Sequence, residues 1–306
     1  LRLPFLFWCV LLLQARTWVL FLMAGASRQQ GDAILNLFYP DHDRFWLGLL
    51  PGVPAVLAFL LSGYRQRLPR LWFRKPLAPS LYPLLPLSWL FRGLVCLRRG
   101  LYGLGVIRSC RLPVPVVVVG NLTVGGSGKT PLVLWLVDEL RAHGWRPGII
   151  SRGYGGASDD ETIVRDDSDA RVVGDEPLLL VGRSRAPVVV GRDRVAAGRA
   201  LLAAHPECDV IISDDGLQHY ALARDIELVV VDGARRFGNG CLLPMGPLRE
   251  PMTRLKRVDA IICNGGTPAQ GEYPMALVAA APRRVCDDAP LEAPLAGPVD
   301  ALAGIG

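Results

Sequence analysis

A glycine-rich loop between an apolar strand and a helix constrains this chain more than any other feature. Residues 115–120 (PVVVVG) have the continuous apolar pattern of a strand that is buried on both faces. Residues 123–130 (TVGGSGKT) follow, and Pro131 opens a segment of helical length. Glycines let backbone N–H groups approach phosphate oxygens at a helix N-terminus. The order of strand, loop and helix therefore predicts a phosphate-binding loop (P-loop).

Each residue type in this loop suits the binding of a nucleoside triphosphate. We expect Lys129 to reach the β- and γ-phosphates and the Thr130 hydroxyl to bind Mg²⁺. The usual pattern begins with glycine, where this chain has Thr123. The competing interpretation is an ordinary glycine-rich turn. The residues expected to bind the nucleotide are Thr123, Gly125, Gly126, Ser127, Gly128, Lys129 and Thr130.

Two acidic motifs follow along the chain. Residues 209–219 (DVIISDDGLQH) are an apolar strand that ends in Asp214 and Asp215, either of which would suit Mg²⁺ in a Walker B element. The alternative is a pair of turn-forming aspartates. Residues 173–177 (VGDEP) contain Asp175 and Glu176, of which one would orient or deprotonate a hydroxyl and the other help to bind metal. Here the alternative is that Asp175 caps a helix that starts near Glu176.

Two further loops carry weaker signals. Residues 151–156 (SRGYGG) place glycines beside an arginine and a tyrosine, which is typical of a loop that approaches a ligand. Residues 243–251 (LPMGPLREP) contain Arg249, which would neutralise phosphate charge or simply face solvent.

From Pro113 onward, short β-branched runs alternate with segments of helical length. This alternation predicts an α/β fold, a P-loop NTPase-like and mostly parallel sheet with helices on both faces. The expected strands are 115–120, 146–151, 187–191, 209–213, 226–232 and 258–264, and the expected helices are 131–143 and 193–205. Residues 279–298, rich in alanine and proline, are expected to form a linker or loop.

The N-terminal third is apolar and predicts membrane contact. The whole chain is 51% hydrophobic with a mean hydropathy of +0.30, and the excess lies in its first third. Residues 3–26 and 45–64 are long apolar runs, so membrane helices are expected to precede the α/β fold. Residues 81–97 are shorter and basic at one end, which favours an interfacial anchor over a buried helix of the next domain. The predicted boundaries are 1–75 for a membrane segment, 76–112 for the anchor and a basic linker, and 113–306 for the P-loop domain.

The net charge and the cysteines limit which partners and which binding sites the sequence predicts. The net charge is +6, and arginines are concentrated between Arg65 and Arg111 among apolar residues, which favours anionic lipid over nucleic acid as the partner. The basic residues that follow the run 45–64 should lie on the cytoplasmic side of the membrane. The seven cysteines are scattered and form no CxxC pair, so neither a zinc site nor a disulfide framework is expected.

Taken together, these motifs resemble the tetraacyldisaccharide 4′-kinase family, the lipid A 4′-kinases of Gram-negative bacteria. The resemblance rests on NLTVGGSGKTP, SRGYGG, VGDEP, DDGLQH and LPMGPLREP in this order, and it runs from about residue 77 to the end of the chain. The altered loop with Thr123 is a trait of the family. The run 81–97 matches the family's membrane-associating helix.

The resemblance implies a reaction and a set of roles. The γ-phosphoryl group of ATP would pass, with Mg²⁺, to the 4′-hydroxyl of a lipid A disaccharide 1-phosphate, giving lipid IVA in lipid A biosynthesis. The enzyme would work at the inner membrane, with its catalytic domain on the cytoplasmic face. Asp175 would be the general base, with Lys129 and Arg249 at the phosphates. The positions associated with metal would be Thr130, Glu176, Asp214, Asp215 and Gln218.

The chain also departs from the family's pattern at both ends. The family continues beyond the last residue here with a His-rich motif, whose histidine is thought to pair with the general base. We therefore expect a C-terminally truncated kinase domain that is inactive or only partly folded. Residues 1–75 have no counterpart in the family and would be a fused membrane segment, an over-extended gene start or an extra module.

Two alternative functions are open, and the second comes from another class of protein. One is a different membrane-associated P-loop NTPase, either a GTPase or a cofactor-assembly ATPase. A GTPase should carry an NKxD motif, yet the nearest strand-end asparagine, Asn264, is followed by two glycines. The other is a transport or scaffold subunit that binds ATP only for regulation. It should have more well-formed membrane spans and should need no acid outside the Walker elements.

Overall fold

The computed structural model describes residues 68–74, 77–153 and 161–278. The chain divides into two compact units, Leu1–Leu71 and Trp72–Gly306. Of the first unit, only residues 68–71, in the short helix α5 (Leu68–Trp72), are described, and the predicted apolar runs 3–26 and 45–64 lie outside the described residues. The predicted linker 279–298 also lies outside them.

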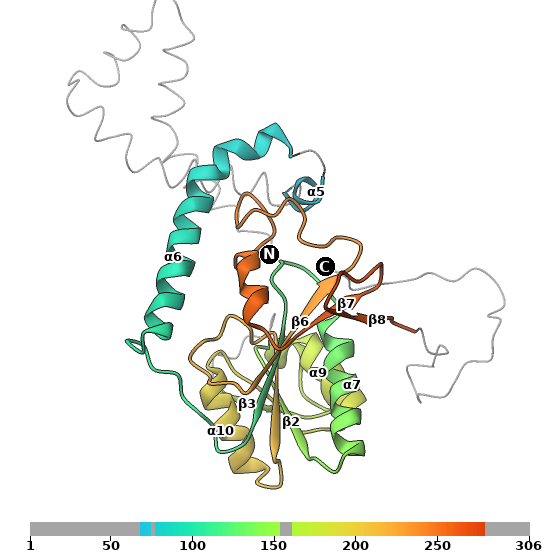
Figure 1. Cartoon of the computed structure of the whole chain (residues 1–306). Coiled ribbons are helices and arrows are strands. Elements are labelled where there is room, and N and C mark those ends of the chain that lie inside the picture. Colours follow the sequence, from blue (N-terminus) through green and yellow to red (C-terminus); the bar gives the residue numbers. More distant parts are fainter. Residues whose placement is uncertain (1–67, 75–76, 154–160, 279–306) are drawn as a thin grey trace, which may run out of the picture. The chain divides into compact units, whose positions relative to one another are not determined.

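The second unit is built on an eight-stranded sheet (Figure 1). The strands are β1 (Val116–Gly120), β2 (Pro147–Ser151), β3 (Thr162–Val164), β4 (Val188–Val190), β5 (Val210–Asp214), β6 (Ile226–Asp232), β7 (Ala260–Asn264) and β8 (Glu272–Met275). Their order is β3-β4-β2-β5-β1-β6-β7-β8, and every neighbouring pair is parallel except β3 and β4. The prediction of a mostly parallel α/β sheet is confirmed.

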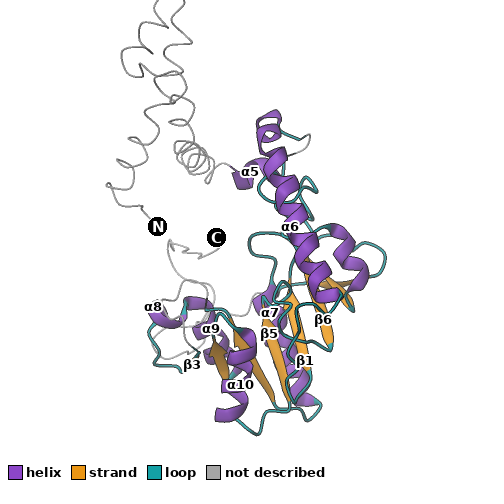
Figure 2. Ribbon diagram, turned by 90° about the vertical axis from the view of Figure 1, so that its left-hand side faces the viewer, coloured by secondary structure: helices purple, strands orange, loops and turns teal. Residues whose placement is uncertain are grey.

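Helices cover both faces of this sheet. On one face, α7 (Lys129–Ala142) and α9 (Asp175–Ser184) pack in a core with Val119, Ile149 and Ile212. On the other face, α10 (Arg194–Ala204) packs in a core that contains Val118, Ile150 and Ile211. Adjacent residues of one strand thus enter different cores, because successive side chains point to opposite faces. Figure 2 shows the short helix α8 (Ala170–Val173) and α9 beside β3 at one edge of the sheet.

The register of the central strands sets the position of the functional residues. In β1, Val119 lies opposite Asp214 of β5, so the loop after β1 and the acids after β5 leave the sheet at the same edge. Parallel sheets bind ligands at this carboxyl edge. The sequence motifs that are far apart along the chain therefore meet here.

The six predicted strands and both predicted helices are present, with ends that differ by at most two residues. Helix α7 begins at Lys129, before the predicted start at Pro131, because Gly128 at φ 91° already forms the N-cap. Strands β3 and β8 and helix α8 were not predicted. β3 has three residues, and β8 contains Pro274, which is tolerated on an edge strand but weakens a strand pattern.

The predicted anchor is helical. A 3-10 helix, η1 (Pro79–Leu84), leads into the long helix α6 (Leu85–Gly103), and a second 3-10 helix, η2 (Met252–Arg257), precedes β7. In α6 only Ser88 is buried, and Trp89 and Leu94 are 64% and 57% exposed. The alternative of a buried helix is therefore wrong. By length and composition alone, and among the described residues, Pro79–Gly103 is the one helix that could cross a membrane.

Candidate functional site

The phosphate-binding loop is held in place by the motif 243–251. The N–H of Val124 donates to the Pro247 carbonyl (2.8 Å), and the N–H of Arg249 donates to the Leu122 carbonyl (2.7 Å). Thr123 forms an antiparallel bridge with Leu248. The LPMGPLREP segment thus forms an extended strap along the start of the loop, which brings Arg249 to the loop's edge.

Lys129 and Thr130 at the start of α7 face acids from two other segments. The Thr130 hydroxyl donates to Glu176 Oε1 at 2.5 Å, and Lys129 Nζ lies 3.7 Å from Asp215 Oδ1. These contacts bring the first turn of α7 together with the start of α9 and the end of β5. The residues predicted from three separate motifs therefore occupy one site.

Asp214 at the end of β5 is the most strongly perturbed acid of the site. It is 1% exposed, and neither of its carboxylate oxygens has a hydrogen-bond partner within the described residues. Burial, and then the nearby Glu176 carboxylate, raise its pKa to about 7. A buried carboxylate without partners needs a cation or a proton to balance it.

A magnesium ion fits this arrangement. The described residues contain no group of three His, Cys, Asp or Glu side chains placed as a closed metal cage. Mg²⁺ does not require one, since it is usually held by one or two carboxylates, water and the substrate's phosphates. The unpaired oxygens of Asp214, with the Thr130 hydroxyl and Glu176 beside them, supply the hard oxygen ligands that this ion prefers.

Asp215 differs from Asp214 in its partners and in the direction of its pKa shift. Arg249 Nη1 donates to both Asp215 carboxylate oxygens at 3.1 Å. Burial alone would raise the pKa of Asp215, but Lys129 and Arg249 hold it below its usual value. Its φ of 47° turns the chain out of β5. Asp215 therefore pairs with two cations, whereas Asp214 has a carboxylate open to metal.

Asp175 is the first residue of α9, with Gly174 as N-cap at φ 92°. The alternative that Asp175 caps this helix is wrong, because no side chain makes a cap hydrogen bond there. The Asp175 carboxylate is exposed and has no hydrogen-bond or ion-pair partner in the part of the chain described. It is therefore free to accept a proton from a ligand that lies beside Glu176.

A cavity of about 350 Å³ opens beside these acids. Gln218 lies in its wall, where its Nε2 donates to the Asn121 carbonyl at 3.0 Å and its Oε1 faces Arg249 at 3.5 Å. Phe91 and Val95 of α6 make one side of the cavity apolar, and the other lining residues are polar or charged. The lining residues are Phe91, Val95, Arg98, Ser151, Arg152, Glu176, Asp215, Gln218, Tyr220, Arg249 and Glu250.

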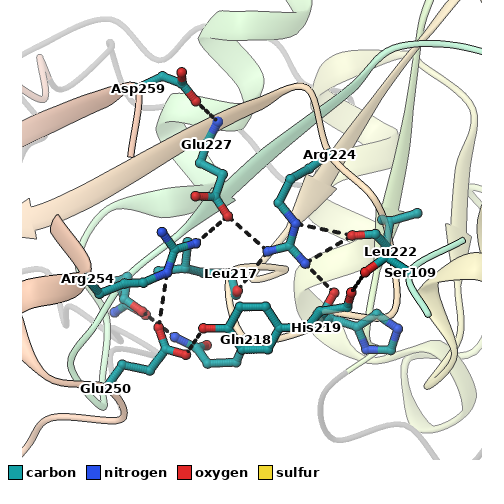
Figure 3. Close-up of polar contacts among 12 residues, drawn as sticks. Ser109, Leu217, Gln218, His219, Leu222, Arg224, Glu227, Glu250, Arg254 and Asp259 are labelled. Atoms are coloured by element: carbon teal, nitrogen blue, oxygen red, sulfur yellow. Dashed lines mark hydrogen bonds and ion pairs between the residues drawn. The ribbon is translucent and has the colours of Figure 1, made fainter. Parts of the chain in front are cut away.

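A buried polar network supports the floor of this cavity (Figure 3). The Tyr220 hydroxyl donates to Glu250, which lies 3.6 Å from Arg254 Nε, and Arg254 in turn pairs with Glu227. Burial and the Glu250 carboxylate raise the pKa of Tyr220 to about 12, so its hydroxyl stays protonated. Arg224 completes the network by donating to Glu227 at 3.0 Å.

A second and larger cavity, of about 620 Å³, lies between α7 and the strands β6 to β8. Apolar residues such as Leu136, Ile262 and Leu277 line it, and none of its lining residues is an acid, a base or a hydroxyl nucleophile other than Tyr273. The titratable groups converge on the smaller cavity instead. The chemistry of this site therefore belongs there.

Sequence reasoning placed the acids and Arg249 but missed several residues of the site. Tyr220 directly follows the motif 209–219, and Glu250 lies within the motif 243–251, in which only Arg249 was predicted as a site residue. Arg152 had a signal in the SRGYGG motif, of which residues 154–156 lie outside the described residues. Arg235 and Asn264, which contact the phosphate-binding loop, carried no signal that pointed to this contact.

A phosphate loop with Lys129 at its end faces a metal-accessible acid and a cavity that is polar on one side and apolar on the other. This fold and site define a P-loop phosphotransferase. A family model described as "Tetraacyldisaccharide-1-P 4'-kinase" matches residues 81–306, and the chain belongs to this family. The resemblance seen in the motifs and the expectation of a kinase are thereby confirmed.

Relatives with known names support this family assignment. The chain is 60% identical over 240 residues to the tetraacyldisaccharide 4′-kinase of Aeromonas hydrophila, covering 78% of this chain and 71% of that protein. It is 56% identical to the enzyme of the same name from Shewanella sediminis, covering 73% of this chain and 66% of the relative. A solved structure of LpxK from Aquifex aeolicus, an "apo" form in complex with ATP, is similar with a TM-score of 0.59 and 34% identity. That likeness covers 64% of each chain.

A second family model matches the N-terminal part. It is described as a protein of unknown function (DUF2919) and covers residues 1–101, so it overlaps the kinase model over residues 81–101. The N-terminal residues without a counterpart in the kinase family are thus similar to a different family.

Proposed function

We propose that this chain transfers the γ-phosphoryl group of ATP to the 4′-hydroxyl of a lipid A disaccharide 1-phosphate, giving lipid IVA. The observation that carries this proposal is the two-sided cavity of about 350 Å³. An acylated sugar phosphate needs an apolar wall for its acyl chains and a polar wall for its sugar, and both walls meet here within reach of the phosphate loop. A water-soluble acceptor would need no apolar wall from an exposed helix.

Different residues of the chain have different roles in the proposed phosphoryl transfer. The N–H groups of the loop and Lys129 bind and orient the phosphates, which is most of what this reaction requires of a protein. Arg249 balances the charge that develops on the transferred group, while its pairing with Asp215 fixes its position. Arg98 and Arg152 in the cavity wall offer positive charge to an anionic acceptor.

Asp175 is the general base in this proposal. A sugar hydroxyl is a weak nucleophile, and a carboxylate that accepts its proton as the new bond forms speeds the attack. The support is the free, exposed carboxylate at the start of α9, next to Glu176 in the cavity wall.

Thr130, Glu176 and Asp214 are the residues that would hold Mg²⁺, and Asp215 and Gln218 lie near them. When bound, this ion neutralises phosphate charge and orients the phosphates for transfer. Asp214 must be ionised for that role, and a cation beside its unpaired oxygens favours the ionised form.

The membrane surface is the second partner that we propose. Exposed apolar side chains of α6, such as Trp89, Leu90, Leu94 and Leu97, would enter the headgroup region. Arg92 and Arg99 on the same helix would pair with anionic lipid. We infer that residues 113–306 form the kinase domain on the cytoplasmic face of the inner membrane, with residues 76–112 as its anchor and 1–75 as a separate membrane segment.

A transfer assay tests the proposed function. The protein is incubated with γ-labelled ATP, Mg²⁺ and lipid A disaccharide 1-phosphate in detergent micelles, and labelled lipid is measured. Because the likeness covers 71% of the Aeromonas hydrophila relative, a chimera that adds the uncovered part of that relative is assayed beside it. Labelled lipid IVA from either protein supports the proposal, and no labelled lipid from both overturns it.

A further inference from the structure

Three successive carbonyl groups of the phosphate-binding loop are each bound by a side chain from a different strand end. Asn121 Nδ2, just after β1, donates to the Gly125 carbonyl at 3.2 Å. Arg235, just after β6, donates through Nη2 to the Gly126 carbonyl. Asn264 Nδ2, at the end of β7, donates to the Ser127 carbonyl at 3.0 Å.

These contacts determine which way the loop's N–H groups point. In a trans peptide the C=O of one residue and the N–H of the next point in opposite directions. Binding the carbonyls of residues 125, 126 and 127 on one side therefore directs the N–H groups of residues 126, 127 and 128 to the other side. Within the described residues these three N–H groups have no partner in the chain, so they remain available as donors to an anion.

Arg235, one of the three donors, is itself held in place by its neighbours. Arg235 Nε pairs with Asp232 Oδ2 at 2.6 Å, and its guanidinium lies 5.7 Å from the centre of the Phe73 ring. Asp232 also accepts hydrogen bonds from the N–H groups of Ala234 and Arg235, which set the turn after β6. The Asp232 side chain thus holds Arg235 against the loop.

Asn264 reaches the loop because of Gly128. A Cβ atom at residue 128 would lie 2.3 Å from Asn264 Nδ2, and φ at this residue is 91°. Asn121 is fully buried, and its own carbonyl accepts from Gln218 in the wall of the acceptor cavity. The same side chains therefore link the loop to the sheet. Through Asn121 and Gln218, they also link it to the wall of the acceptor cavity.

We propose that Asn121, Arg235 and Asn264 are positioning residues that hold the phosphate loop with its N–H groups turned toward the nucleotide. This carbonyl clamp rests on the proposed function, because it acts on the loop that binds the phosphates of ATP. It also gives Asn264 a role other than reading a guanine base, since the lysine of an NKxD motif does not follow it. The Asn264 side chain binds the loop backbone here.

The test compares nucleotide affinity with stability in variants of the protein. Arg235→Gln shortens the side chain so that its donor no longer reaches the Gly126 carbonyl, and Asn264→Leu removes the donor to Ser127. Each should raise the Kd for MgATP about tenfold, the change expected for one hydrogen bond near the upper end of its usual contribution. The double variant should raise it further. Arg236→Gln is the matched control, because it breaks the ion pair of the next residue with Glu272 without touching the loop.

Titration calorimetry gives the Kd, and thermal melting without nucleotide gives the stability. The proposal holds if both loop variants lose affinity while Arg236→Gln loses stability only. It is overturned if both variants bind MgATP within about twofold of the wild type, or if the control loses as much affinity as they do. A wild-type protein that transfers phosphate while the variants bind normally would overturn the clamp and leave the proposed function standing. A wild type that binds no MgATP would overturn both.

Discussion

The two sides of the site are built in different ways. The nucleotide side comes from one continuous stretch, residues 123–130, whose backbone does most of the binding. The acceptor cavity is lined by side chains from five separate segments, which lie in or near α6, β2, α9, β5 and the strap at 243–251. A phosphate group is the same in every nucleotide and can be bound by backbone. A lipid acceptor has to be recognised by its shape and its mixed polarity, which only side chains provide.

This difference predicts that substitutions will separate into two groups. Changes at the phosphate loop should affect nucleotide binding, and changes around the cavity should affect the acceptor or the transfer step alone.

The largest effect is expected at Asp175. Asp175→Asn should lower the transfer rate by about 10²–10⁴-fold, the usual contribution of a general base, and leave the Kd for MgATP within about twofold. Single-turnover transfer and calorimetry measure the two quantities. Asp166→Asn, at an exposed acid nearby in the chain, is the control and should change neither. Equal losses in binding and transfer would make Asp175 part of the nucleotide side.

Unlike Asp175, Lys129 should contribute to nucleotide binding as well as to transfer. Lys129→Ala removes the cation at the end of the loop and leaves Asp215 with Arg249 as its remaining partner. Transfer should fall by about 10²–10³-fold, as for loss of a preorganised charge-stabilising donor, and MgATP binding should weaken with it. Lys256→Ala, at an exposed lysine on η2, controls for loss of charge alone. Unchanged MgATP affinity would show that Lys129 does not contact the phosphates.

The apolar face of α6 should matter only when the acceptor is presented in a bilayer. Leu94→Glu places a charge on a 57% exposed leucine and should lower binding to anionic phospholipid vesicles by about tenfold, because a leucine side chain contributes about 1.5–3 kcal/mol when fully buried. Leu179→Glu, on the exposed face of α9, is the matched control. Equal vesicle binding by both variants in a sedimentation assay would contradict a membrane role for this face.

A smaller effect is expected at the floor of the cavity. Tyr220→Phe removes the hydroxyl that donates to the buried Glu250, which then keeps only its weaker contact with Arg254. The KM for the acceptor should rise about three- to tenfold, in line with the loss of one hydrogen bond. Tyr102→Phe, at the ring that packs 5.7 Å from Tyr220, is the control. A change in the KM for ATP instead would place Tyr220 on the nucleotide side.

The last prediction concerns the pH dependence of stability and not binding or transfer. Asp214 has a pKa of about 7 in the folded chain against an ordinary value of 3.8, so the folded state holds a proton that the unfolded state releases. Between these values stability should fall as the pH rises, and the loss should be complete above about pH 7. Melting of the protein without metal or nucleotide should show this slope. Asp214→Asn should flatten it, and an unchanged slope in that variant would assign it to another group.

The sequence predicted the nucleotide side far better than the acceptor side. The loop, its lysine and the strand-end acids are contiguous motifs, and the buried strands before them have a continuous apolar pattern, so both the fold and these residues could be read locally. Tyr220, Arg152 and Arg98 enter the cavity only because distant segments meet at one edge of the sheet. Arg235 and Asn264 act by donating to backbone carbonyls, and sequence does not encode that geometry.

The position of the acceptor is the most direct test of this division. A lipid A disaccharide 1-phosphate that carries a photoreactive diazirine on one acyl chain is irradiated with the protein in micelles, and the labelled peptides are identified by mass spectrometry. We predict labelling at α6 near Phe91 and Val95, which line the smaller cavity. Labelling confined to the larger cavity beside α7, around Trp135 and Leu277, would contradict the proposed acceptor site.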